Sequence, residues 1–103
     1  MYRKINAREA KEMMEGGKDF ILLDVRTSGE YKEKHIKGAI LIPNDEIRKR
    51  ASGELPDKGA LILVYCRSGG RSAQASRELV KMQYTNIYDM GGINDWPFDT
   101  VSG

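Results

Sequence analysis

The feature that most constrains the fold is a set of short, mainly apolar stretches without polar alternation. Residues 20–25 and 61–65 are the longest of them, and Pro43 ends a third. Stretches of this kind are typical of strands that are covered on both faces, as in a parallel sheet. The predicted strands lie near Ile5 and at residues 20–25, 38–42, 61–65 and 87–90.

Helical patterns separate the predicted strands. Asn6 with Glu9, and Thr27 with Glu30, have the three-residue spacing of a capping box, which begins a helix. Helices are predicted at about residues 7–14, 31–34, 45–50 and 71–83, and residues 52–59 form the most loop-like stretch. Because strands alternate with helices, the sequence predicts an α/β fold with a central, mainly parallel sheet flanked by helices.

Length and charge narrow the possible classes of protein. A chain of 103 residues fits one domain, predicted to span residues 1–103. The net charge of +2 comes from 17 basic and 15 acidic residues that are interleaved along the chain, so the sequence predicts no nucleic-acid or membrane partner. A surface of mixed sign fits a monomer. The single cysteine cannot form an intramolecular disulfide, and a free thiol favours a reducing compartment, so the expected location is the cytoplasm.

One segment, residues 66–72 (Cys-Arg-Ser-Gly-Gly-Arg-Ser), combines a nucleophile with groups that bind anions. It begins where a predicted strand ends, and ligands of parallel sheets bind at that edge. Gly69 and Gly70 permit a tight loop whose amides would cradle a negative group and activate a thiol. The sequence therefore predicts Cys66 as the catalytic nucleophile. The predicted substrate-binding residues are Arg67, Ser68, Gly69, Gly70, Arg71 and Ser72.

Other candidate residues favour structural roles. A lone cysteine at a strand end is commonly a core residue, and only the dense arrangement of glycine, arginine and serine around Cys66 favours catalysis. Asp24 and Arg26, at another strand end near the site, are expected to pair with each other or with loop backbone. Nothing in the sequence places His35 beside Cys66, so a structural role is expected for it. One histidine and one cysteine give no ligand cluster, and neither a metal nor a cofactor is predicted.

The order of several motifs along the chain resembles the rhodanese family. These motifs are Leu23-Asp-Val-Arg26, Glu30-Tyr31, His35-Ile-Lys-Gly-Ala39 with Ile42-Pro43, the segment Cys66 to Ser72, and Gly91-Gly92 with Trp96. The resemblance covers nearly the whole chain, and it implies a three-layer fold with a five-stranded sheet. It also implies a ping-pong sulfurtransferase, in which Cys66 takes the outer sulfur of a donor such as thiosulfate and holds it as a persulfide for a thiophilic acceptor. After Trp96, a short tail replaces the longer one of the family pattern.

Three other functions stay open on the residues alone. The first is a persulfide carrier with a protein donor or acceptor, in tRNA thiolation or in iron–sulfur or molybdenum cofactor synthesis. The second is a cysteine-based phosphatase or arsenate reductase, which the loop disfavours because four residues separate Cys66 from Arg71 where those enzymes place five. The third is a non-catalytic binding module, which the retained cysteine disfavours. The expected small-molecule partners are thiosulfate and a thiophilic acceptor.

Overall fold

The computed structural model describes residues 1–103 and contains a five-stranded sheet. The strands are β1 (Arg3–Lys4), β2 (Ile21–Asp24), β3 (Ile40–Leu41), β4 (Ile62–Cys66) and β5 (Ile87–Gly92). Their order is β1-β5-β4-β2-β3, and every neighbouring pair is parallel. The central strand β4 is buried along its whole length, which explains why its sequence is apolar without alternation.

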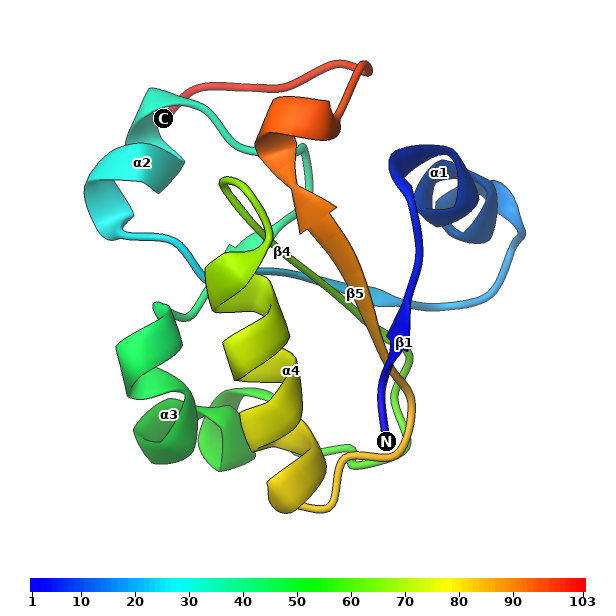
Figure 1. Cartoon of the computed structure of the whole chain (residues 1–103), viewed down its shortest axis with the longest axis vertical. Helices are drawn as coiled ribbons and strands as arrows, with labels where there is room; N and C mark the ends of the chain where they lie inside the picture. The colour runs from blue at the N-terminus through cyan, green and yellow to red at the C-terminus, as the bar shows by residue number, and fades with distance from the viewer.

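The helices form layers on both sides of this sheet. They are α1 (Ala7–Glu15), α2 (Ser28–Glu33), α3 (Ile47–Glu54) and α4 (Gly70–Lys81), with short 3-10 turns η1 (Asn44–Glu46) and η2 (Ile93–Asp95). Figure 1 shows α1 on one side of the sheet, α3 and α4 on the other, and α2 near the loop that follows β4. The predicted three-layer α/β fold is therefore confirmed. None of the helices is both long enough and apolar enough to span a bilayer.

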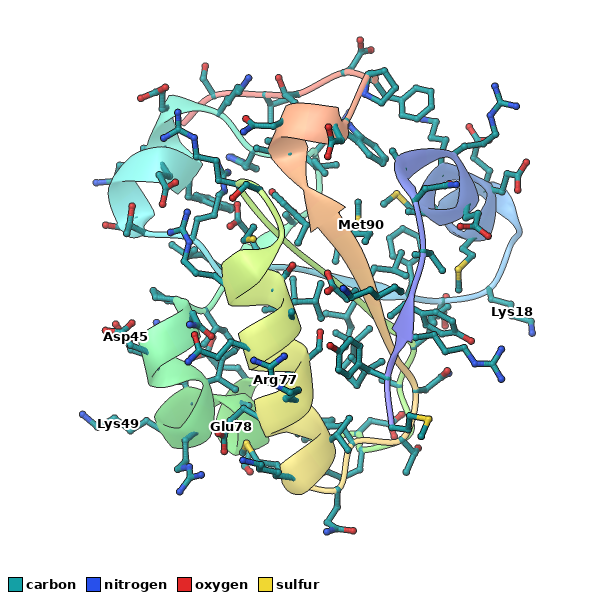
Figure 2. The ribbon with its side chains drawn as sticks, viewed as in Figure 1. Lys18, Asp45, Lys49, Arg77, Glu78 and Met90 are labelled. Carbon is teal, nitrogen blue, oxygen red and sulfur yellow. The ribbon has the colours of Figure 1, made fainter.

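Side-chain alternation along the strands divides the core into two parts. Val64 and Cys66 belong to a cluster of 13 buried residues on the side of α3 and α4, whereas Tyr65 belongs to a cluster of nine on the side of α1. In β5, Ile87 lies in the first cluster and Met90 in the second, and Figure 2 shows Met90 on the α1 side of that strand. Residues 66 and 89 therefore share the face of the sheet that α4 covers.

Both predicted capping boxes are present. Asn6 Oδ1 accepts a hydrogen bond from the Glu9 amide at 2.8 Å, and Glu9 Oε1 accepts one from the Asn6 amide at 2.9 Å. Thr27 and Glu30 make the same reciprocal contacts at 3.2 and 3.0 Å. These contacts satisfy amides that the first turn of a helix leaves without partners. The second box begins α2 at Ser28, three residues earlier than predicted from the pattern that follows it.

Two predicted boundaries were wrong. The loop predicted at residues 52–59 begins inside α3, which continues to Glu54 because Arg50 pairs with Glu54 one turn later and Leu55 is fully buried. The strand predicted at residues 38–42 is reduced to two residues, because β3 lies at the edge of the sheet and pairs only with β2. Neither difference moves the segment that carries Cys66.

Candidate active site

A tight loop joins β4 to α4 at the carboxyl end of the sheet and holds Cys66 at its start. Cys66 is the last residue of β4, and its side chain is almost completely buried. The chain then turns through Gly69, whose φ of +114° is a left-handed conformation that favours glycine. This turn brings the Gly69 amide to 3.0 Å from Cys66 Sγ, with the amide donating. The loop forms because the end of β4, a glycine turn and the start of α4 follow one another directly along the chain.

The loop lies against the end of β5, and Gly92 makes this contact possible. Cys66 pairs with Gly92 after a register shift that begins at Val64. A Cβ atom at Gly92 would lie 2.1 Å from the Arg67 carbonyl oxygen, a distance that the backbone cannot accommodate. The Asn94 amide donates to the same carbonyl at 3.1 Å. Gly91 and Gly92 therefore belong to β5 and position the loop, whereas the sequence pattern placed them after the strand.

The environment of Cys66 favours the thiolate. Burial of the thiol acts to raise its pKa, but hydrogen bonds from the hydroxyl and amide of Ser72 and from the amides of Gly69 and Ser68 outweigh burial, so the pKa lies below its ordinary value. These amides belong to the loop and to the first turn of α4, where backbone donors have no partners within the helix. The loop therefore favours the thiolate, the form of cysteine that can act as a nucleophile.

The two predicted arginines of the loop differ in their contacts. Arg67 is exposed and forms no ion pair. Arg71 forms a bidentate ion pair with Glu30 of α2, with N–O distances of 2.7 and 2.9 Å. The hydrogen bond from Arg71 is the main reason why the pKa of Glu30 falls to about 2. Glu30 thus serves two purposes, because its Oε1 also accepts the Thr27 amide of the capping box.

The structure brings Asp24 and Arg26 together. The Arg26 guanidinium donates to both oxygens of Asp24 and to the Lys34 carbonyl, and the Tyr65 hydroxyl donates to Asp24 at 2.8 Å. Both charged side chains are buried. These contacts join the end of β2, β4 and the segment after α2, so this pair connects parts of the scaffold at the carboxyl end of the sheet.

His35 likewise makes its contacts outside the loop. Its ring stacks on Tyr31 with the ring centroids 3.7 Å apart, and its Nδ1 lies 2.8 Å from the Tyr31 carbonyl. Its backbone pairs with Val101 of the C-terminal tail. Nowhere does the structure gather three or more side chains of the types that hold a metal ion.

Sequence reasoning missed two residues next to the loop. Glu30 was recognised as a helix cap but not as a partner of Arg71, because 41 residues separate the two. Asp89 accepts a hydrogen bond from the Ser72 hydroxyl at 2.7 Å and is buried. The available signal for Asp89 was a carboxylate within an otherwise apolar predicted strand, which requires a polar partner when it is buried.

Comparison with known proteins agrees with this geometry. A model of the rhodanese-like domain family matches residues 6–97. The chain belongs to this family. The thiosulfate sulfurtransferase PspE of Escherichia coli is 38% identical over 81 residues, covering 79% of this chain and 78% of the relative. The thiosulfate sulfurtransferase GlpE of Coxiella burnetii is 31% identical, covering 93% and 88%.

Solved structures of rhodaneses have the same architecture. A rhodanese with anions from E. coli aligns with a TM-score of 0.77 at 36% identity, over 82% of this chain and 100% of that one. A rhodanese-like domain from Anabaena aligns with a TM-score of 0.88 at 29% identity, over 100% and 81%. Both belong to the fold described here. The family match and the sulfurtransferases among the relatives support sulfurtransferase activity.

Proposed function

We propose that this rhodanese-like domain is a thiosulfate sulfurtransferase that carries sulfane sulfur as a persulfide on Cys66. The observation that carries the proposal is the position of the Cys66 sulfur, 3.0 Å from the Gly69 amide, inside a loop whose donors lower the pKa of the thiol. A thiolate held by backbone amides at a helix start is both nucleophilic and fixed in place. The same amides would stabilise the negative outer sulfur of a persulfide.

The reaction divides into two sulfur transfers. In the first, Cys66 Sγ attacks the outer sulfur of thiosulfate, a new S–S bond forms, and the S–S bond of thiosulfate breaks with its electron pair leaving on sulfite. In the second, an acceptor such as cyanide or a thiol attacks the outer sulfur of the persulfide. The S–S bond to Cys66 then breaks, and the electron pair returns to Cys66 as the thiolate.

The remaining loop residues would bind the anionic donor. Arg67 is free to turn toward a sulfonate group because no carboxylate holds it, and Arg71 adds a second guanidinium in a fixed position. The amides of Ser68, Gly69 and Gly70, with Ser72 in the first turn of α4, complete an anion-binding loop. We place the protein in the cytoplasm as part of this proposal, because a reducing compartment keeps the lone thiol free.

A persulfide carrier is the second candidate, and the exposure of the loop favours it. Arg67 and Ser68 are exposed, and Cys66 lines neither of two cavities of about 860 and 420 Å³. A loop at the surface can meet a protein donor or acceptor. The putative sulfur carrier protein YrkF of Bacillus subtilis is 32% identical over 94 residues and covers 90% of this chain, which makes up 50% of that protein.

The test is the intact mass of the reduced protein after incubation with thiosulfate, beside Cys66→Ala. The expected result is the gain of one sulfur atom by the wild type alone, and its loss on addition of cyanide with formation of thiocyanate. A wild type that gains no sulfur from thiosulfate but gains it from a persulfidated cysteine desulfurase would support the carrier function instead. Release of phosphate from an aryl phosphate would contradict both candidates.

A further inference from the structure

The segment that follows α2, residues 34–36, is held from inside the protein at the carboxyl end of the sheet. Its backbone is extended at Lys34, whose carbonyl accepts a hydrogen bond from the Arg26 guanidinium at 2.6 Å. The Ile36 amide donates to the Tyr65 hydroxyl at 3.1 Å. Because Arg26 and Tyr65 are both buried, these contacts fix the segment in its extended conformation.

The backbone of His35, in the middle of this segment, faces outward. In a trans peptide the carbonyl and the amide point in opposite directions. Since the Lys34 carbonyl and the Ile36 amide point inward, the amide and the carbonyl of His35 point away from the core. These two groups form the His35 edge. Val101 occupies it as an antiparallel partner, with both backbone hydrogen bonds at 2.8 Å.

The tail that occupies the His35 edge, residues 97–103, is held loosely. Figure 1 shows it crossing from η2 to α2, and every one of its residues is exposed. Besides the two bonds with His35, the Gly103 amide donates to the Lys32 carbonyl at 2.7 Å. Hydrogen bonds at the surface contribute little net free energy, because water can replace them. The tail can therefore open while the core stays folded.

Basic side chains lie on both sides of the His35 edge. Lys32, Lys34 and Lys37 are exposed, and none of them forms an ion pair. Glu33 is the only acidic residue between positions 32 and 37, and the tail brings one carboxylate, Asp99. Exposed cations of this kind attract an acidic partner and repel a basic one.

We propose that the His35 edge is the docking site for an extended, acidic segment of a protein that accepts sulfur from Cys66, and that the tail occupies the site until this partner replaces it. Addition of an extended segment to an exposed backbone edge is a common mode of recognition. Glu30 of α2 pairs with Arg71 of the catalytic loop, so a segment docked beside α2 lies next to that loop.

The proposal rests on the proposed function and names its acceptor. A cysteine thiolate of the docked partner attacks the outer sulfur of the Cys66 persulfide, and a new S–S bond forms on the partner. The S–S bond to Cys66 breaks, and its electron pair returns to Cys66 as the thiolate. No oxidant or reductant is required.

The test is sulfur transfer from the thiosulfate-loaded protein to synthetic peptides that carry one cysteine. In the first peptide, a glycine–serine spacer joins the cysteine to Asp-Thr-Val-Glu-Asp, an acidic version of the tail sequence. In the second peptide, the valine nitrogen is methylated, and kcat/KM is expected to fall about tenfold because a backbone hydrogen bond is lost. In the third peptide, lysines replace the acidic residues, and a similar loss is expected because like charges repel.

Val101→Pro tests whether the tail and the partner compete for the site. Proline has no amide hydrogen to donate to the His35 carbonyl, so the tail should leave the edge. The kcat/KM for the first peptide is then expected to rise about tenfold, because a competitor on the same chain is removed. With β-mercaptoethanol, a small thiol without a peptide backbone, the rate should stay within about twofold of the wild type. A kcat/KM for the first peptide that does not rise would contradict the competition.

Lys32→Gln combined with Lys34→Gln tests the charge of the site. Two exposed attractions are lost, so kcat/KM for the first peptide is expected to fall about fivefold at low salt. The matched control is Lys49→Gln combined with Lys81→Gln, which removes two exposed lysines from α3 and from the end of α4. This control should change kcat/KM by less than about twofold. Equal losses in the two double variants would refute an acidic partner at this edge.

Two results would overturn the docking site itself. One is an equal kcat/KM for the methylated and unmethylated acidic peptides. The other is an unchanged NMR resonance of the His35 amide when a cysteine-free form of the first peptide is added to isotope-labelled Val101→Pro. The NMR measurement needs no sulfur transfer. A protein that takes no sulfur from thiosulfate would therefore refute the sulfurtransferase, while a shifted His35 resonance would still support the edge as a peptide-binding site.

Discussion

The ion pairs Asp24–Arg26 and Glu30–Arg71 have the same chemistry, and they differ in burial. In the first, the side chains are 0% and 3% exposed, and Arg26 also donates to a backbone carbonyl. In the second, they are 24% and 36% exposed, and the Arg71 guanidinium lies at the rim of the Cys66 loop. Residue type alone therefore does not separate a structural pair from one that belongs to a site.

Burial decides what each arginine can still do. Arg26 has its Nε and Nη2 donors occupied inside the protein, so a substrate anion would have to compete with Asp24 in a buried environment. Arg71 keeps part of its surface in solvent while Glu30 fixes its orientation. An arginine held by one carboxylate at the surface can still attract an anion, and holding it reduces the conformational entropy that binding would cost.

The largest loss of stability is expected when the arginine of the buried pair is removed. Arg26→Met leaves Asp24 charged and buried without its partner, and such losses destabilise proteins by about 3–5 kcal/mol. The measurement is urea unfolding followed by circular dichroism. The control is Arg48→Met, whose side chain is 77% exposed and whose loss should cost less than about 1 kcal/mol. A loss below about 1 kcal/mol for Arg26→Met would contradict a structural role for the buried pair.

Removal of the rim arginine should affect catalysis more than stability. Arg71→Gln is expected to lower kcat/KM for thiosulfate by about 10–100-fold, because a charge-assisted contact to the anion is lost and the Glu30 charge near the thiolate is left unneutralised. Glu30→Gln keeps the arginine, so its loss should be about tenfold or less. For both variants, kcat/KM is measured from the rate of thiocyanate formation. Equal losses of kcat/KM would mean that the pair holds α2 in place and that Arg71 does not contact the substrate.

Much of the fold follows from local sequence signals. The buried strand β4, the two capping boxes and the glycine turn at Gly69 each depend on residues that are close together along the chain. Asp24 and Arg26 are two residues apart at a strand end, so their pairing could also be expected from the sequence. The boundaries of α3 and β3 were less predictable, because they depend on the burial of Leu55 and on which strand lies at the edge of the sheet.

The contacts around Cys66 that escaped prediction are all long-range. Glu30 meets Arg71 across 41 residues, and Ser72 meets Asp89 across 17. The requirement for glycine at position 92 comes from the Arg67 carbonyl on a neighbouring strand end. A sequence pattern indicates the candidate nucleophile and its loop, but strand order determines which carboxylates lie beside them.

The Glu30–Arg71 pair at the rim should also make the free energy of unfolding depend on pH, and a variant without the Glu30 charge should lack this dependence. The pKa of Glu30 is about 2 in the folded protein, below its ordinary value of 4.5, mainly because of the Arg71 hydrogen bond. Its contribution is therefore complete above about pH 4.5 and is lost as the pH falls toward 2. Since the pair is partly exposed, wild type and Glu30→Gln should differ by only about 1 kcal/mol at pH 7. Glutamine preserves the capping box, so the variant isolates the charge.

The measurement is urea unfolding of both proteins at pH 7, 4.5 and 3. The difference in their free energies of unfolding should shrink steadily from pH 4.5 downward. A constant difference would mean that the ion pair is not the source of the stabilisation. A difference that grows as the pH falls would have the opposite sign to that of a carboxyl whose pKa is lowered by folding.

The smallest effect is expected for a pair that is fully at the surface. Glu15 pairs with Lys11 one turn away on α1, and their side chains are 64% and 39% exposed. Glu15→Gln should change the free energy of unfolding by less than about 0.5 kcal/mol, because water screens the attraction and two long side chains must be ordered. Lys11 keeps its contact over the Phe98 ring in this variant. A loss of stability comparable to that of Arg26→Met would show that exposure does not determine how much each pair stabilises the fold. The comparison between the buried and rim pairs would then lose its physical basis.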